Sequence, residues 1–364
     1  MTRIVLFGHG WWAQKYLVPG LRSVPGADLV ALCGRDTGRA QAAAANLGVG
    51  RTFTDIHAML EATEPDGLLI VSPPSSHVDA VRAAGAQGVP VFCEKPLGRN
   101  GTETAEMVTA CANVPTIVGF TQRWHPGVRL AARLTDELGR LRHLRYTSAS
   151  CIAANAQAAW DWRSDSQQYA YGVLSDLGPH AVDIAEWLGG EITDVTATAH
   201  TVFPDRPDGR NGRRAVDNWD DCVVSARTAD DVAVSLALTR VLPPSPYRRF
   251  QHRLELVGDS GTLTYDSDRP AEVVLTTGGA APRVVRADGP DLNGTTPGSF
   301  QEFMAVSDHA AAREAADILA VFGGQKPTAA PTVADGHRGQ VVLDAAAASA
   351  RTRTWTHLKK ASSP

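Results

Sequence analysis

The sequence predicts an α/β protein with an N-terminal doubly wound parallel sheet and a C-terminal α+β domain built on a large, mostly antiparallel open sheet. In the first third of the chain, short apolar runs alternate with Ala-rich helical stretches, as a parallel sheet covered on both faces requires. After residue 120, long segments alternate polar with apolar residues, which is typical of strands with one buried face. A chain of 364 residues is longer than a single hydrophobic core usually supports. Because a domain typically has roughly 150 residues, this length indicates two domains.

The N-terminal domain is expected over residues 1–120. Its strands are short β-branched runs, expected at Ile4–Phe7, Leu29–Cys33, Leu68–Val71, Val89–Cys93 and Ile117–Gly119. Between them, Ala-rich stretches predict helices over Trp11–Val24, Thr37–Leu47, Ser76–Gln87 and Thr102–Cys111. Because βαβ crossovers are right-handed, these elements are expected to form a doubly wound sheet with helices on both faces.

The C-terminal domain is expected over residues 121–330. Alternating segments predict strands at Leu144–Cys151, Val195–Val202, Asp221–Thr228, Val232–Thr239, Arg253–Val257, Gly261–Tyr265 and Glu272–Thr276. Pro204–Val216 is rich in Pro, Gly, Asp and Arg, and it is predicted to be a surface loop. The last segment, residues 331–364, carries an Ala-rich helix over Thr332–Arg351 that is expected to pack back on the body of the protein.

Charge and composition make several partners and sites unexpected. A formal net charge of −4 gives no reason to expect nucleic acid or an anionic membrane as a partner. Five scattered cysteines form no Cys-x-x-Cys or Cys/His cluster, so neither a disulfide framework nor a metal site is indicated. No signal-peptide pattern precedes the first strand, and no apolar run approaches the length of about 18 residues that a membrane span needs. The expected protein is soluble and cytoplasmic.

The first expected strand leads directly into the sequence Gly-His-Gly-Trp-Trp-Ala, which opens the first expected helix. That placement fits a dinucleotide-binding turn, in which Gly8 makes the tight turn, Gly10 admits the pyrophosphate and Ala13 packs helix against strand. The unpaired N–H groups and the positive dipole end of the helix would hold the phosphates. Trp11 and Trp12 are bulky for this position and are expected to wall the cleft. The sequence therefore predicts a Rossmann domain that binds a dinucleotide.

The residues around the second expected strand bear on which dinucleotide is bound. Fingerprint spacing nominates Asp28 as the ribose-binding acid, but Asp28 begins the strand, whereas the ribose lies beyond its end. Gly34 at that end leaves room for a 2′-phosphate, and Arg35 can pair with it, with Arg39 either assisting or merely solvated. Asp36 is the competing acid for an unphosphorylated ribose. This charge arrangement favours NADP, with NAD as the alternative.

A lysine is expected near the reacting atoms. Glu94, Lys95 and Pro96 follow the strand Val89–Cys93, and doubly wound sheets bind their ligands beyond the carboxyl ends of the strands. There Lys95 can polarise a carbonyl group or pass a proton. The alternative is a solvated lysine that caps the turn.

A second candidate group lies at the start of a predicted helix in the C-terminal domain. Pro179 suits the first helical position, and His180, Asp183 and Trp187 then share one face of the helix. Asp176 precedes the helix and lies close to that face. A histidine beside a carboxylate suits proton transfer coupled to hydride transfer. The alternative is a capping aspartate and a core histidine.

Several short motifs occur in a fixed order along the chain. They are Gly8-x-Gly10, Val71-Ser72-Pro73-Pro74 with His77, Glu94-Lys95-Pro96, Asp176-x-Gly178-x-His180-x-x-Asp183, Gly258-x-x-Gly261-x-Leu263 and a terminal helix that ends near Trp355. Together the motifs resemble those of the Gfo/Idh/MocA family, which is named for glucose–fructose oxidoreductase, inositol dehydrogenase and rhizopine catabolism proteins. The resemblance covers nearly the whole chain.

This resemblance implies roles for individual residues. His180 would be the proton-transfer residue, and Asp176 would orient its imidazole. Lys95 would bond to the reacting oxygen. Asp183 would lie near the substrate. The cofactor side would be lined by Ser72, Pro73, His77 and Glu94.

The resemblance further implies contacts with substrate or nicotinamide for Arg123, Trp162 and Arg163. The alternative for these three is a core tryptophan and two ion-paired surface arginines. Two positions depart from the family pattern. Tyr171 interrupts the Gly-rich run that often precedes the catalytic aspartate, and it is expected to reshape the substrate pocket. His125 stands where members often carry asparagine.

These features predict an oxidoreductase that transfers a hydride between a nicotinamide and a secondary alcohol or ketone of a sugar, cyclitol or ketosugar derivative. The expected partner is a small polyhydroxylated molecule. A redox-neutral enzyme with a tightly bound cofactor and a non-catalytic dinucleotide-binding sensor are the alternatives. The intact Lys95, Asp176 and His180 argue against the sensor. An open sheet with one uncovered face also predicts a homodimer or homotetramer.

Overall fold

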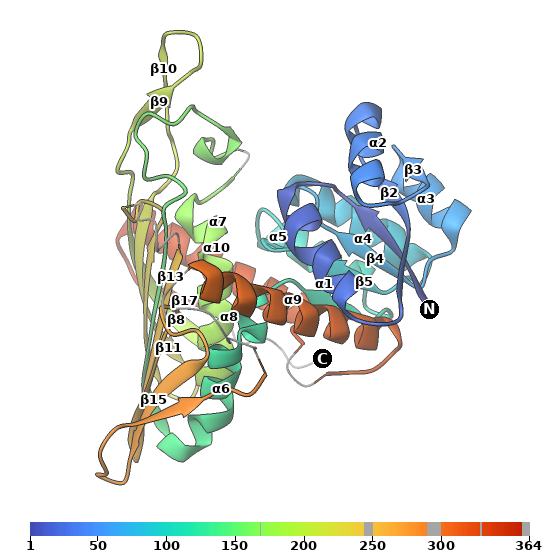
Figure 1. The fold of residues 1–364 in the computed structure, drawn as a ribbon. Coiled ribbons are helices and arrows are strands. Elements are labelled where there is room, and N and C mark those ends of the chain that lie inside the picture. Colours follow the sequence, from blue (N-terminus) through green and yellow to red (C-terminus); the bar gives the residue numbers. More distant parts are fainter. Residues whose placement is uncertain (168, 244–249, 290–299, 328–329, 359–364) are drawn as a thin grey trace. The chain divides into compact units, whose positions relative to one another are not determined.

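The structure is a computed structural model that describes residues 1–167, 169–243, 250–289, 300–327 and 330–358. The chain divides into two compact units (Figure 1). One unit joins Met1–Trp124 to Asp308–Gln340, and the other joins His125–Ser307 to Val341–Pro364. No helix within the described ranges is both long and apolar enough to cross a membrane.

The N-terminal unit contains a six-stranded parallel sheet in the order β3-β2-β1-β4-β5-β6. Its strands are β1 (Thr2–Phe7), β2 (Ala27–Cys33), β3 (Thr52–Phe53), β4 (Gly67–Ile70), β5 (Val91–Cys93) and β6 (Thr116–Val118). The strand order reverses between β1 and β4, and ligands of such sheets bind outside the carboxyl ends of the strands at that point. The predicted doubly wound sheet is confirmed. Strand β3 was not predicted from the sequence, because two residues carry no periodic pattern.

Four helices follow strands β2 to β5, and side chains cap three of them. They are α2 (Thr37–Asn46), α3 (Ile56–Thr63), α4 (His77–Ala86) and α5 (Gly101–Ala110). Asp36, Asp55 and Asn100 precede three of them, and each accepts a hydrogen bond from the backbone N–H three residues later. The first expected helix is divided into a π turn, Ala13–Leu17, and α1 (Val18–Ser23). Because Pro19 has no N–H to donate to the preceding turn, the regular helical ladder cannot run through it.

Helix α9 (Phe300–Phe322) belongs to the N-terminal unit from Asp308 onward, although the sequence analysis placed this stretch in the second domain. Its apolar side chains, among them Ile318 and Phe322, share one buried cluster with side chains of β1 and β2. Gly67 at the start of β4 makes this packing possible, because a Cβ atom there would overlap the Phe322 ring. The N-terminal unit therefore extends beyond residues 1–120.

The C-terminal unit is built on a nine-stranded sheet in the order β16-β15-β14-β13-β7-β12-β11-β8-β17. All neighbouring strands are antiparallel except β7 and β12. This confirms the predicted large, mostly antiparallel sheet. The strands are β7 (Leu141–Ser150), β8 (Ile192–His200), β11 (Asp221–Thr228), β12 (Ala233–Thr239), β13 (Phe250–Gly258), β14 (Gly261–Asp266), β15 (Glu272–Thr277), β16 (Arg283–Arg286) and β17 (Thr356–His357).

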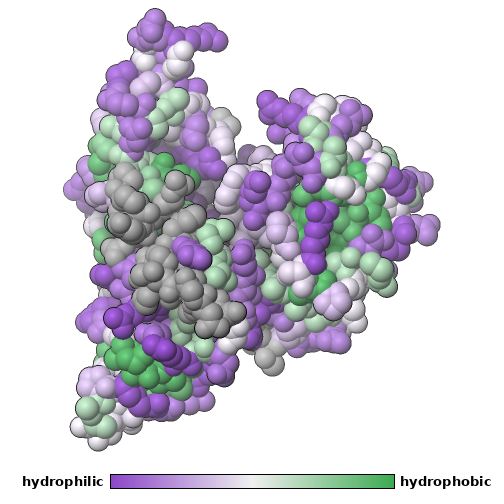
Figure 2. All heavy atoms as spheres, viewed as in Figure 1, coloured by the Kyte–Doolittle hydropathy of each residue, from purple (hydrophilic) through white to green (hydrophobic). Residues whose placement is uncertain are grey.

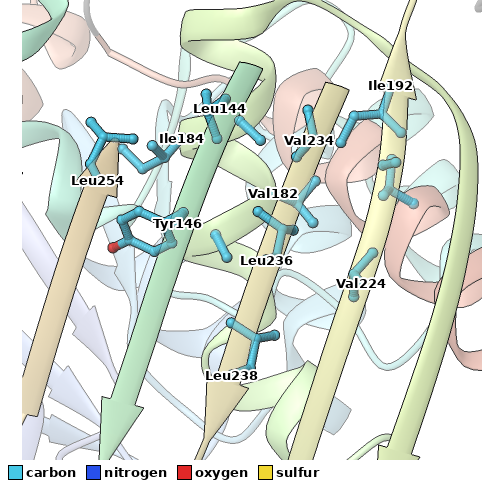
Figure 3. Close-up of a cluster of buried hydrophobic side chains, with 14 of the residues drawn as sticks. Leu144, Tyr146, Val182, Ile184, Ile192, Val224, Val234, Leu236, Leu238 and Leu254 are labelled. Carbon is cyan, nitrogen blue, oxygen red and sulfur yellow. The ribbon is translucent and has the colours of Figure 1, made fainter. Parts of the chain in front are cut away.

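One face of this sheet is covered by helices. Val182 and Ile184 of α8 (Gly178–Gly189) pack in one buried cluster with Leu144 and Leu236 of the central strands (Figure 3). Residues of α6 (Pro126–Leu134) and the second half of α10 (Val333–Thr352) belong to the same cluster. The core thus lies between the sheet and these helices.

The other face of the sheet is largely exposed. Along β11 every second residue is exposed, and Val223 retains 53% of its accessible surface. Arginines of β7 and β13 form ion pairs, such as Arg145 with Glu255 and Arg253 with Asp266. This face combines apolar side chains with neutralised charges.

The segment predicted to be a surface loop contains two short strands, β9 (Asp205–Pro207) and β10 (Arg213–Ala215), which pair as an antiparallel hairpin. The loop prediction was wrong for these residues. Asp208 Oδ1 accepts hydrogen bonds from the backbone N–H groups of Arg210 and Gly212, at 2.7 and 3.0 Å, and so closes the turn. Strands of three residues are too short to stand out from a Pro- and Gly-rich composition.

Candidate active site

The Gly-x-Gly turn follows β1 and has the backbone that a phosphate-binding turn needs. Gly8 has a φ of 98°, and a Cβ atom there would lie 2.6 Å from the backbone N of Ser72. Only glycine fits that position. At Gly10 a Cβ atom would meet nothing within 4 Å, so the backbone is open to an approaching group. These residues therefore fit a dinucleotide pyrophosphate.

The groups expected at the ribose follow β2. Arg35 and Arg39 are exposed there. Asp36 is the N-cap of α2, and its Oδ1 accepts a hydrogen bond of 2.9 Å from the backbone N–H of Arg39. The small size of Gly34 already serves the protein, because a Cβ atom there would lie 2.5 Å from the imidazole of His9. Both a cation and an acid are thus available for a ribose or its phosphate.

The two tryptophans of the turn differ in their surroundings. Trp11 is 70% exposed. Trp12 stacks on Tyr16 with ring centroids 4.2 Å apart, and its Nε1 donates a hydrogen bond of 2.5 Å to Glu94 Oε1. Trp12 therefore joins the phosphate-binding turn to the segment that carries Lys95.

Glu94 is a buried acid at the carboxyl end of β5. Its Oε2 accepts a hydrogen bond of 3.0 Å from the backbone N–H of Lys95, which precedes Pro96 in a cis peptide bond. Burial raises the pKa of Glu94 to about 7, and the nearby Lys95 and the Trp12 indole offset part of that rise. Glu94 thus titrates near neutral pH beside the candidate catalytic lysine.

A second buried acid, Glu314 of α9, lies in the same unit. Burial, with the neighbouring Glu94 and Asp317, raises the pKa of Glu314 well above its usual value, and Tyr16 offsets only part of the rise. No hydrogen bond of regular geometry reaches either of its carboxylate oxygens from the described residues. Glu314 was not predicted from the sequence, because it carries no motif and other charged residues, Arg313 and Asp317, lie beside it in the same helix.

His77 links two loops at the carboxyl ends of the strands. Its Nδ1 lies 3.0 Å from the carbonyl oxygen of Leu97, and its Nε2 lies 2.8 Å from that of Ser72. Burial lowers the pKa of His77. The hydroxyl of Ser72 lies 2.8 Å from that of Ser76, and Pro73 lies between them in sequence. His77 is therefore placed to fix the loops on the expected cofactor side.

Arg123 belongs to the N-terminal unit, in the short 3-10 helix Thr121–Trp124. Only 7% of its surface is exposed, so the alternative of a surface arginine does not describe it. Its neighbour Trp124 donates a hydrogen bond of 2.7 Å from Nε1 to Asp317 Oδ2 of α9. In the C-terminal unit, burial lowers the pKa of His125 to about 4.

The second candidate group lies in the C-terminal unit, at the junction of α7 (Val173–Asp176) and α8. Asp176 ends α7, and His180 and Asp183 lie in the first turns of α8 with 7% and 5% of their surfaces exposed. The Tyr169 hydroxyl forms a hydrogen bond with Asp176, and burial followed by the Asp176 charge raises the pKa of Tyr169. Asp176, His180 and Asp183 thus lie within one short stretch of the chain. Tyr169 contacts this group as the hydrogen-bond partner of Asp176, and it was not predicted from the sequence.

The segment before α7 carries the other expected substrate contacts. Trp162 packs edge-on against Tyr169, with ring centroids 5.1 Å apart, and the Arg163 guanidinium lies 4.4 Å from the centre of the Trp162 ring. Burial, with the charge of Asp344, raises the pKa of the half-buried Tyr171 to about 12. These aromatic and cationic side chains suit a polyhydroxylated molecule, which needs both apolar ring faces and hydrogen-bond donors.

No group of three or more His, Cys, Asp or Glu side chains in the described part of the chain is arranged to hold a metal ion. The two candidate groups consist of proton-transfer and hydrogen-bonding side chains, with Lys95 in one and Asp176, His180 and Asp183 in the other. This chemistry suits proton movement beside a bound cofactor.

Comparison with known proteins places the chain in a family. Residues 2–121 match a family model described as an oxidoreductase family with an NAD-binding Rossmann fold, and residues 129–264 match that of the Gfo/Idh/MocA C-terminal domain. The chain belongs to the Gfo/Idh/MocA family. The expectation drawn from the ordered motifs is confirmed.

Several relatives are sugar or cyclitol dehydrogenases. Inositol 2-dehydrogenase of Acidothermus cellulolyticus is 26% identical over 97% of this chain and 94% of its own length. Levoglucosan dehydrogenase of Pseudarthrobacter phenanthrenivorans is 27% identical over 64% of this chain and 63% of its own length. D-apiose dehydrogenase of Paraburkholderia graminis is 31% identical, but the match spans about half of its length (52%).

Solved structures share the fold over nearly the whole chain. An oxidoreductase domain protein from Kribbella flavida has a TM-score of 0.86 at 27% identity, and the match covers 99% of this chain and 100% of that one. A complex of levoglucosan dehydrogenase with NADH and L-sorbose has a TM-score of 0.87 at 23% identity, with 99% of each chain covered. At that identity the second likeness shows the fold alone.

Proposed function

We propose that this protein is an NAD(P)-dependent dehydrogenase or reductase that interconverts a secondary alcohol and a ketone on a sugar, cyclitol or ketosugar derivative. The observation that carries the proposal is the junction of α7 and α8, where Asp176, His180 and Asp183 lie together in the unit expected to hold the substrate. The names of the sugar and inositol dehydrogenase relatives support the substrate class.

In this proposal the cofactor supplies hydride transfer at its nicotinamide, and the chain supplies binding, orientation and proton transfer. The Gly8–Gly10 backbone holds the pyrophosphate. His180 accepts the proton from the substrate hydroxyl during oxidation, and Asp176 keeps the imidazole oriented. Lys95 bonds to the same oxygen and stabilises the negative charge that develops on it.

We also propose NADP as the preferred cofactor, with the exposed Arg35 paired with the 2′-phosphate. Asp36 already caps α2 through one carboxylate oxygen, so its use as the ribose ligand competes with that role. Titration with NADPH and with NADH, followed by nicotinamide fluorescence, tests this. Tighter NADPH binding that Arg35→Ala selectively weakens is expected, whereas equal losses for both cofactors would count against the assignment.

The exposed face of the C-terminal sheet supports a third proposal, that the protein is a homodimer or homotetramer through this face. The evidence is the one-sided burial of the sheet and the exposure of Val223 and Val274, at 53% and 39%. Light scattering tests it: an assembly that dissociates on Val223→Arg is expected, and a monomer at working concentration would end the proposal.

The catalytic roles are tested by substitution. A single acid–base residue typically contributes roughly 10²–10⁴-fold to a rate. We therefore expect His180→Ala and Lys95→Ala each to reduce turnover by about that factor while the dissociation constant of the cofactor stays within about threefold. Unchanged turnover in either variant would remove that residue from the mechanism.

A further inference from the structure

The hairpin formed by β9 and β10 makes hydrogen bonds to the chain that precedes α7. It lies between β8 and β11, and hydrophilic side chains cover its tip (Figure 2). A hairpin of three-residue strands has little core of its own, so its contacts with the rest of the C-terminal unit decide its role. Those contacts converge on one stretch of chain, residues 153–173, which runs from the end of β7 into α7.

The buried side of the hairpin is anchored by Arg206, which is only 5% exposed. Its guanidinium donates hydrogen bonds to the carbonyl oxygens of Ala153 and Asn155, at 2.7 and 2.8 Å. Two donors of one planar group thus hold two backbone carbonyls in a fixed relation. Arg206 therefore fixes the beginning of the stretch.

Trp160 is held from both strands of the hairpin. Its backbone N–H donates to the carbonyl oxygen of Pro207 on β9 at 2.7 Å, and its Nε1 donates to that of Ala215 on β10 at 3.0 Å. The Arg214 guanidinium lies 3.3 Å from the centre of the indole ring. The residue two positions before Trp162 is therefore locked to the hairpin.

The chain that follows β10 continues the attachment. Asp217 accepts hydrogen bonds of 2.7 Å from both the backbone N–H and the hydroxyl of Ser166. Asn218, only 2% exposed, donates through Nδ2 to the carbonyl oxygens of Arg163 and Tyr169. Its Oδ1 accepts a hydrogen bond of 3.2 Å from Arg240. One amide group thus fixes two backbone positions.

The stretch held in this way carries the candidate substrate contacts Trp162, Arg163 and Tyr171, and it carries Tyr169, the partner of Asp176. We propose that the β9–β10 hairpin and Asn218 are a positioning device that sets substrate affinity and specificity by fixing residues 160–167 and 169–171. The inference rests on the proposed function, because it concerns how that same site holds its sugar or cyclitol.

The test compares Asn218→Ala and the isosteric Asn218→Asp with the wild type. Asn218→Asp keeps the shape but turns a carboxylate oxygen toward the two carbonyl groups, which removes both donated hydrogen bonds. Arg210→Ala is the matched control, because Arg210 is exposed at the hairpin turn and bonds Asp208 through its backbone N–H, which the substitution keeps. Kinetics with the best substrate of a sugar and cyclitol panel are measured beside hydrogen exchange of residues 153–173.

For both Asn218 variants we expect KM to rise by about tenfold or more and kcat to change by less than about threefold, because misplaced contacts weaken binding. The rank order of substrates should change, hydrogen exchange should accelerate within residues 153–173, and cofactor affinity should stay unchanged. Arg210→Ala should match the wild type. Faster exchange with an unchanged KM and rank order would overturn the proposal, as would equal losses across all substrates and the cofactor.

If the Asn218 variants fail to fold, Trp160→Phe tests the same proposal, because it removes the Nε1 hydrogen bond to Ala215 while it keeps an aromatic ring beside Arg214. A change in KM and substrate rank order without a change in cofactor affinity is again expected, and unchanged values would overturn the proposal. Failure of the proposed function is distinguishable, since it would appear as a wild-type protein that binds cofactor but turns over no member of the panel. In that case, faster hydrogen exchange of residues 153–173 in the variants would still show that the hairpin anchors this stretch.

Discussion

Each unit buries a carboxylate, but the two carboxylates have different partners. Asp220 of the C-terminal unit, only 1% exposed, receives hydrogen bonds from the Arg240 guanidinium at 3.0 Å and from the backbone N–H groups of Val202 and Phe203 at 2.9 and 3.2 Å. In the N-terminal unit, Glu94 receives one indole N–H and one backbone N–H, has the Glu314 carboxyl group as a neighbour, and is only partly compensated by the nearby Lys95 charge.

The difference in partners gives the two buried acids different roles. A carboxylate with a matched cation and several donors is a structural tie, and removing its partner leaves an uncompensated charge. A carboxyl group with too few donors and a second acid beside it favours the neutral form instead. The first arrangement supports the residues that follow the hairpin, and the second lies beside Lys95.

The largest effect is expected from breaking the compensated pair. Arg240→Ala should destabilise the protein by about 3–5 kcal/mol, because Asp220 and Asn218 lose a buried cation. Thermal and urea unfolding measure this free energy. A loss below about 1 kcal/mol would show that the pair is not a structural tie.

A smaller effect of opposite sign is expected from the acid pair. Glu314→Gln should stabilise the protein at pH 8 by about 1–3 kcal/mol, since it removes a buried acid that favours its neutral form. A raised pKa in the folded state means that the folded protein holds the proton more tightly than the unfolded chain. The penalty is therefore absent at low pH, grows as the pH rises above the usual carboxyl pKa, and is complete above the folded pKa.

Urea unfolding at pH 5 and at pH 8 tests this sign. The advantage of Glu314→Gln over the wild type should be larger at pH 8. Glu61→Gln is the control, because Glu61 is exposed on α3 and should show no such dependence. An advantage that is larger at pH 5 would contradict the account.

Removal of one donor from Glu94 should have an intermediate consequence. Trp12→Phe deletes the hydrogen bond to Glu94 and should cost about 1–2 kcal/mol. Because that bond lowers the pKa of Glu94, the substitution should move its titration above about 7. NMR titration of side-chain-labelled glutamate follows this change, and an unchanged or lowered pKa would contradict the assignment of the indole as a charge-stabilising donor.

The smallest effect is expected on the exposed face of the C-terminal sheet. Arg145 and Glu255 form an ion pair at 2.8 Å, but their side chains are 53% and 38% exposed. Arg145→Ala should therefore cost no more than about 0.5 kcal/mol, which solvent and salt screen further. A loss comparable to that of Arg240→Ala would erase the contrast between buried and exposed pairs.

The parts that sequence could predict are those with a local pattern. The parallel sheet, the antiparallel sheet and the turn at Gly8 follow from periodicity and from glycine placement near each strand. Glu314 and Asn218 could not be found in this way. Their importance arises from burial against residues distant in sequence, and neither residue carries a motif. The hairpin at Asp205–Ala215 was missed because its strands are too short for a periodic signal.

The same distinction applies to the proposed catalytic residues. Lys95 and His180 follow from motifs in the sequence, whereas Tyr169 has no motif and is visible only as the partner of Asp176. Gly34 shows the converse, because its small size predicts space for a phosphate, while the structure shows the His9 ring against it. A glycine at such a position indicates that another group lies close to its backbone, but the sequence alone does not identify that group.

The central claim, hydride transfer to a ketone of a sugar-like substrate, is tested most directly by isotope transfer. Reduced cofactor carrying deuterium at C4 of the nicotinamide is incubated with a ketosugar and oxidised-cyclitol panel, and the products are analysed by mass spectrometry. The account predicts one deuterium on the new carbinol carbon of at least one product, with His180→Ala slowing its appearance by roughly 10²–10⁴-fold. Tight cofactor binding with no deuterium in any product would contradict the account and favour a sensor.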